Sequence, residues 1–86
     1  MYKLELTDTA KKSFEHIMRS DPKLGTRLAN AINRLMQTPS LGVPLKGELK
    51  GLLKYRVGTY RILYQVHKLK LLITVIDIGH RREIYR

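Results

Sequence analysis

Apolar and polar residues alternate near the start of the chain. The alternation over residues 2–7 predicts a strand. Three further strands are expected at residues 52–57, 60–67 and 71–78, and the last is the most apolar. A strand that is apolar on both faces belongs inside a sheet, so we expect the last strand to be central, with the N-terminal strand on its free side.

Between these strands, two segments repeat their apolar residues at the spacing of one helix face. Thr7 or Asp8 is the expected N-cap of the first helix, and Asp21 followed by Pro22 begins the second. The second helix should end before Pro39, because the residue preceding a proline avoids helical geometry. The two apolar stripes consist of Ala10, Phe14, Ile17 and Met18, and of Leu24, Leu28, Ala31, Ile32, Leu35 and Met36.

Residues 39–51 contain two prolines and three glycines, so we expect a loop without a regular element. The predicted fold is α+β, with the order β-α-α-β-β-β. It is a small, mainly antiparallel four-stranded sheet with a helical hairpin packed on one face. A chain of 86 residues has room for one core, so residues 1–86 are expected to form a single domain.

Gly58-Thr59 is a plausible two-residue turn, which pairs Arg56 with Arg61 across a hairpin. One face of the hairpin is then apolar and is expected beneath the helices. Tyr60 and Tyr64 should lie on that face with their hydroxyls in water. The residues of that face are Leu53, Tyr55, Val57, Tyr60, Ile62, Tyr64 and Val66.

The other face of the hairpin is cationic: Lys54, Arg56 and Arg61 share it, and Arg81 extends it. Like charges directly opposite each other destabilise a sheet, so an anion bound between the arginines is the natural explanation. The alternative is a solvated face on which Asp77 neutralises Arg61, since a turn at residues 68–70 would place these two residues opposite each other. One acid does not balance four bases.

The net charge of the chain is +10, and all of it comes from residues 23–86, because residues 1–22 carry four basic and four acidic groups. Such an excess favours a polyanionic partner: nucleic acid, an acidic protein or an anionic membrane. The absence of cysteine and the presence of only three histidines argue against disulfides and structural zinc, and we expect no cofactor. The longest apolar run, Leu71–Ile76, is too short to span a bilayer, and Met1–Glu5 has no apolar signal region. We therefore expect a cytoplasmic protein.

The available side chains, lysine, arginine and tyrosine, suit metal-free cleavage of RNA. In that reaction the 2′-hydroxyl attacks the adjacent phosphate. Paired arginines would stabilise the charge that develops on the phosphate. A lysine crowded by arginines has its pKa lowered toward use as a base, and a tyrosine can stack on a splayed nucleobase.

Two segments, Leu53–Val66 (LKYRVGTYRILYQV) and Ile78–Arg86 (IGHRREIYR), resemble the second hairpin and the C-terminal end of RelE-type toxins of the RelE/ParE superfamily. The resemblance, with the matching element order, covers nearly the whole chain. It implies a toxin that enters the ribosomal decoding site and cuts mRNA there without a metal. It also implies a small acidic antitoxin, similar to RelB, that covers the basic face.

The resemblance also implies roles for individual residues. Arg61 would stabilise the transition state, Arg81 would act on the leaving-group side, and Tyr85 would stack on the substrate or help to activate it. Lys54 matches one of two strand lysines credited with base or charge-stabilising work, whereas Leu52 stands where the second lysine would align. Arg56 is the residue that would compensate for the missing second lysine.

The remaining cations, Lys46, Lys50, Arg82 and Arg86, are expected to contact RNA phosphates and position the substrate. His80 should lie on the helix-covered face as a structural residue. Two other functions stay open at this point. One is a ParE-like toxin that binds DNA gyrase and does no chemistry, and the other is an RNA-binding module that has lost cleavage.

Overall fold

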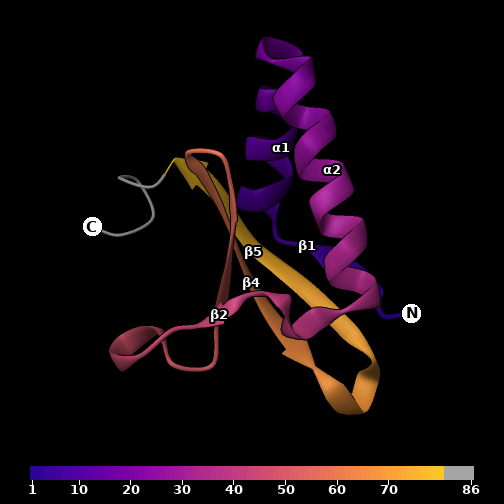
Figure 1. Ribbon diagram of the computed structural model, residues 1–86, viewed down its shortest axis with the longest axis vertical. Helices are drawn as coiled ribbons and strands as arrows, with labels where there is room; N and C mark the ends of the chain where they lie inside the picture. The colour runs from indigo at the N-terminus through magenta and orange to yellow at the C-terminus, as the bar shows by residue number, and fades with distance from the viewer. Residues whose placement is uncertain (81–86) are drawn as a thin grey trace.

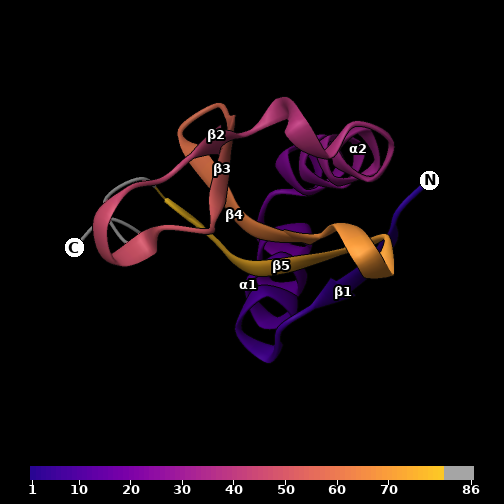
Figure 2. The same cartoon turned by 90° about the horizontal axis from the view of Figure 1, so that it is seen from below.

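The computed structural model describes residues 1–80, which form two helices packed on a five-stranded sheet. Helices α1 (Asp8–Ser20) and α2 (Pro22–Gln37) lie side by side (Figure 1). Helix α1 packs on strand β5, and helix α2 contacts β3. The strands follow the order β1-β5-β4-β3-β2 from one edge to the other (Figure 2). They comprise β1 (Lys3–Leu6), β2 (Val43–Pro44), β3 (Leu53–Val57), β4 (Tyr60–His67) and β5 (Leu72–His80). The α+β class and the central place of the last strand are confirmed.

Both helices begin at the residues that the sequence indicates. Thr7 is the N-cap of α1: its Oγ1 accepts a hydrogen bond from the Ala10 amide at 3.1 Å. The same hydroxyl donates to the Ile76 carbonyl at 2.6 Å, so the cap also ties α1 to β5. Asp21 caps α2 by accepting from the Leu24 amide at 3.2 Å, and Pro22 is the first helical residue.

The hairpin between β3 and β4 has the predicted register, with Arg56 opposite Arg61 and Val57 opposite Tyr60. Gly58 has φ +61°, a conformation that favours glycine and begins the tight turn. At the far edge, β1 runs parallel to β5, with Glu5 paired to Thr74.

The register between β4 and β5 differs from the expectation. Arg61 pairs with Gly79, and Asp77 pairs with Leu63, so the predicted pairing of Arg61 with Asp77 is wrong. Two one-residue shifts account for the difference. At the turn, His67 pairs with Leu72 instead of Leu71, and an irregularity between Leu63 and Tyr64 leaves one extra residue, Ile76, on β5.

Residues 39–51 are more regular than expected. They contain the two-residue strand β2, in which Val43 pairs with Lys54, and two short 3₁₀ turns at Pro39–Leu41 and Gly47–Leu49. The prediction of four strands was therefore one short. Proline tolerates this position because β2 is an edge strand, where a missing amide hydrogen costs no ladder hydrogen bond on the open side.

The core lies between the helices and the predicted apolar face of the sheet. From the helices it contains Leu28, Ala31 and Leu35, and from the sheet Ile62 and Tyr64 among others. Within residues 1–80, no helix is long and apolar enough to cross a membrane.

Candidate functional site

The sheet face turned away from the helices, called the open face below, carries the predicted cationic residues. Lys54 and Arg56 come from β3, and Arg61 comes from β4, directly across the hairpin from Arg56. The two arginines differ in environment: Arg56 is exposed, whereas only 5% of Arg61 is accessible. The fold therefore holds two like charges side by side and keeps one of them largely out of water.

Arg61 has little to compensate its burial. Its Nη1 donates to the Tyr60 carbonyl at 3.5 Å, which is at the limit of a hydrogen bond. No carboxylate within residues 1–80 forms an ion pair with it. Asp77, the predicted neutralising group, lies opposite Leu63 and accepts a hydrogen bond from the Ile78 amide at 2.8 Å. The predicted neutralisation of Arg61 by Asp77 is therefore wrong, and a buried guanidinium without a carboxylate partner among residues 1–80 is suited to an anionic ligand.

The other predicted residues lie as follows. Lys54 is half-buried on the open face, opposite Leu63. Lys46 and Lys50 are exposed in the segment between β2 and β3. Four predicted site residues lie outside the described part of the chain: Arg81, Arg82, Tyr85 and Arg86.

His80 lies on the helix side of the sheet, as predicted. Its ring meets that of Tyr60 edge-on, with centroids 5.7 Å apart. The opposite end of the open face holds a polar cluster that the sequence analysis did not find. His67 Nε2 lies 3.2 Å from the Thr74 hydroxyl, and that hydroxyl donates to Glu5 Oε1 at 3.4 Å. In the described residues, no group of three or more His, Cys, Asp or Glu could hold a metal ion.

Residues 39–44, which lead into and include β2, are attached to the sheet by Tyr64. This side chain is fully buried, and its hydroxyl donates to the Pro39 carbonyl at 2.6 Å and accepts from the Gly42 amide at 2.8 Å. The expectation of a hydroxyl in water was wrong for Tyr64, because the 39–44 segment folds over it. Burial raises the pKa of the Tyr64 hydroxyl above 10.0, and the hydrogen bond to Gly42 opposes that rise only in part.

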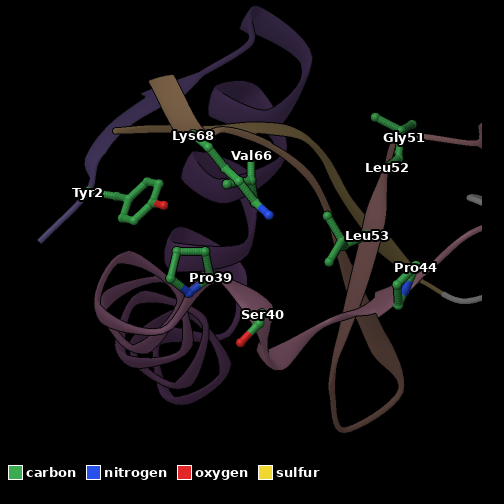
Figure 3. Close-up of a pocket in the computed structure, with 9 residues that line it drawn as sticks. All are labelled: Tyr2, Pro39, Ser40, Pro44, Gly51, Leu52, Leu53, Val66 and Lys68. Atoms are coloured by element: carbon green, nitrogen blue, oxygen red, sulfur yellow. The ribbon is translucent and has the colours of Figure 1, made fainter. Parts of the chain in front are cut away.

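An apolar groove of 490 Å³ opens beside this segment. Its walls include Tyr2, Pro39, Leu53 and Val66, and Lys68 extends toward the middle of the opening (Figure 3). Leu52, at the position where the resemblance would place a second lysine, also lines this groove. Leu52 thus contributes to an apolar surface instead of a cationic one.

Residues 4–85 match a family model described as the ParE toxin of the type II toxin–antitoxin system parDE. The chain belongs to this family of toxins.

Two other comparisons agree with this assignment. The chain is 30% identical to Toxin RelG of Mycobacterium tuberculosis over 99% of its own length and 97% of the relative's. Its fold is similar to that of the RelBE2 toxin–antitoxin complex of the same organism, with a TM-score of 0.81 and 28% identity over 93% of this chain and 98% of that one. It also resembles a YoeB/ParE toxin from Agrobacterium tumefaciens, with a TM-score of 0.84 and 25% identity over 92% and 98% of the two chains.

For this ParE-family toxin, the predicted RelE/ParE membership is confirmed. The names of these relatives, RelG, RelBE2 and YoeB/ParE, state no reaction, so membership alone does not select the chemistry. That choice depends on the arginines of the open face.

Proposed function

We propose that this toxin is a metal-independent endoribonuclease that cleaves mRNA in the decoding site of the ribosome. The observation that supports the proposal is Arg61, which is 5% exposed, faces Arg56 across the hairpin and has no carboxylate partner in residues 1–80. A guanidinium held in this way is ready to bind a phosphate without first breaking an ion pair.

In the proposed reaction, the 2′-oxygen of one nucleotide attacks the neighbouring phosphorus. The P–O2′ bond forms and the bond to the 5′-oxygen breaks, which gives a 2′,3′-cyclic phosphate and a free 5′-hydroxyl. One proton leaves the 2′-oxygen, and one is delivered to the departing 5′-oxygen. Arg61 and Arg56 would stabilise the charge on the phosphate, and Lys54 would help to remove the first proton. Arg81 and Tyr85 keep their proposed roles at the leaving group and the substrate base, while Lys46, Lys50, Arg82 and Arg86 would position the RNA.

We also propose a cognate acidic antitoxin, similar to RelB, as the second partner, and the cytoplasm as the place of action. The RelBE2 structure is a toxin–antitoxin complex, and the open face of this chain is cationic. An acidic segment would relieve the repulsion between Arg56 and Arg61 and keep RNA out. If exposed charge pairs dominate, the affinity should fall as salt rises from low to high concentration. An affinity that does not change with salt would exclude electrostatic capture.

The direct test is a single-turnover cleavage assay on ribosomes programmed with mRNA. Arg61→Ala should reduce the rate about 10²–10³-fold, which is typical for the loss of one transition-state donor. Arg19→Ala, on the exposed surface of α1, is the matched control and should cleave normally. Normal cleavage by Arg61→Ala would remove Arg61 from the site.

A test in cells distinguishes the ParE-like alternative, which the description of the family model favours. After brief expression, primer extension would show discrete cuts within codons for a nuclease. Intact mRNA together with defects in DNA supercoiling would instead identify gyrase as the target.

A further inference from the structure

Helix α2 carries a row of polar side chains on its solvent face. Lys23, Arg27, Asn30 and Arg34 follow one another at spacings of four, three and four residues, and all four are exposed. This spacing places them on one face of the helix, over roughly 16 Å at 1.5 Å per residue. Helix α2 contains no acidic residue, so nothing on the helix itself neutralises this cationic row.

Two members of the cationic row meet the β3–β4 hairpin at a cleft of 190 Å³. The guanidinium of Arg27 lies over the turn, 3.6 Å from the place where a Cβ at Gly58 would be. Arg34 Nη1 donates to the Tyr55 hydroxyl at 3.4 Å. Asn30 lines the cleft between them. Arg56 also lines the cleft, so three arginines, an asparagine and a tyrosine surround one small opening.

No carboxylate belonging to residues 1–80 lines the cleft or pairs with Arg27 or Arg34. The cleft is also distinct from the proposed catalytic site, because α2 packs against the apolar side of the sheet, whereas Arg61 lies on the open face. Arg56 lines the cleft and also pairs with Arg61 across the hairpin.

The chemistry of the cationic row favours nucleic acid over protein. The centre of a protein–protein interface is depleted of charge and contains apolar anchors. Helix α2 exposes only polar side chains after Pro22, the first helical residue. Arginine, lysine and asparagine are typical contacts to phosphate oxygens. A straight row on a rigid helix suits the regular backbone of a duplex better than a flexible single strand.

We propose that the cationic row and its cleft form a second RNA site, which binds the phosphate backbone of double-stranded RNA. The site would hold structured RNA while the open face engages the single strand to be cut. This inference rests on the proposed RNA-directed function, and it adds a contact that needs no cleavage to be observed.

The experiment measures binding of the full-length toxin to a fluorescent 20-base-pair RNA duplex of mixed sequence across a series of salt concentrations. The test variant is Arg27→Gln/Arg34→Gln, and the control is Lys11→Gln/Lys12→Gln, which removes two exposed cations from α1. The test variant should lower the slope of log K against log salt by about 2, one for each lost phosphate contact. At 0.15 M salt this corresponds to a loss of about 30-fold, which disappears near 1 M. The control should keep most of the wild-type slope.

Arg27→Lys/Arg34→Lys should restore most of the slope of log K against log salt, because a lysine also neutralises a phosphate. This variant distinguishes a loss of charge from a loss of folding. A wild-type slope in the Gln variant, or an equal loss in the control, would overturn the proposal. A polyglutamate peptide is the second probe. If the Gln variant lost this peptide but kept the duplex, the ligand would be an acidic protein and the RNA site would be refuted. A toxin that does not cleave mRNA would refute the proposed function. The salt dependence of duplex binding would still show whether the cationic row binds double-stranded RNA.

Discussion

Removing one oxygen atom from Tyr64 should destabilise the protein clearly more than removing the same atom from Tyr60. Tyr64→Phe keeps the buried ring but leaves the Gly42 amide and the Pro39 carbonyl without the partner that now lies 2.8 and 2.6 Å away. A buried polar group without a partner costs about 1–3 kcal/mol. The phenol's own desolvation is no longer required in the variant, and the Pro39 contact is only part-buried, so the net loss should be about 2 kcal/mol.

A loss of that size is easy to measure. A domain of this length has a total stability of roughly 4–13 kcal/mol, and each kilocalorie shifts its melting temperature by about 4–8 °C. Urea unfolding followed by circular dichroism should give the free energy, and the melting temperature should fall by about 8–16 °C. Hydrogen exchange at the Gly42 amide should also become faster.

Tyr60→Phe is the matched control, because the Tyr60 hydroxyl makes no hydrogen bond to any other described residue and its ring keeps the edge-on contact with His80. It should change stability by less than about 0.5 kcal/mol. If Tyr64→Phe were as mild as Tyr60→Phe, the two hydrogen bonds would contribute nothing and the 39–44 segment would be held by packing alone.

Four further predictions follow from the same contacts and from the proposed site. Because burial raises the pKa of Tyr64 above 10.0, its contribution to stability is complete below pH 10 and is lost as pH rises through the folded-state pKa; urea titrations above pH 10 should therefore show a steeper loss in the wild type than in Tyr64→Phe. Gly42→Ala should cost about 1–3 kcal/mol in the same assay, because its Cβ would clash with the Tyr64 hydroxyl and lie 2.8 Å from the Lys54 carbonyl. Arg61→Leu should abolish cleavage yet raise the free energy of unfolding by about 1 kcal/mol, and a loss of stability would show that the guanidinium has a partner. Tyr85→Phe should keep most single-turnover cleavage while Tyr85→Ala loses it, since stacking needs the ring and contributes about 1–3 kcal/mol; an inactive Phe variant would assign a role to the hydroxyl.

The features that could be predicted from the sequence are those fixed by neighbouring residues. Thr7 and Asp21 each cap a helix by bonding an amide three residues ahead, and Gly58 sets the turn that pairs Arg56 with Arg61. Each of these depends on side-chain type and spacing over a few positions. The helices and the first hairpin register were accordingly predicted correctly.

The second hairpin register was wrong because the turn and an extra residue on β5 each shift it by one position, and a distant contact is made at the extra residue. The carbonyl of Ile76, the extra residue of β5, accepts a hydrogen bond from the hydroxyl of Thr7, near the other end of the chain. The turn before β5 also uses Leu71 at φ +51°, a conformation that is unusual for a leucine. No local pattern marks either feature. Strand β2 was missed for a related reason: the prolines and glycines around it indicate a loop, and the segment is ordered by Tyr64, 20 residues or more further along.

In the candidate site too, the sequence predicted which residues are paired across the strands but not how far each one is buried. Residue parity was sufficient to place Arg56 opposite Arg61, but it could not show that one is exposed and the other is 5% accessible. That difference determines their chemistry. An anion interacts more strongly with a guanidinium from which water has been removed, and the empty site is correspondingly less stable. In the proposed function, Arg61 would therefore bind a phosphate more strongly at a cost in folding stability, whereas the exposed Arg56 would add charge to the site with little effect on stability.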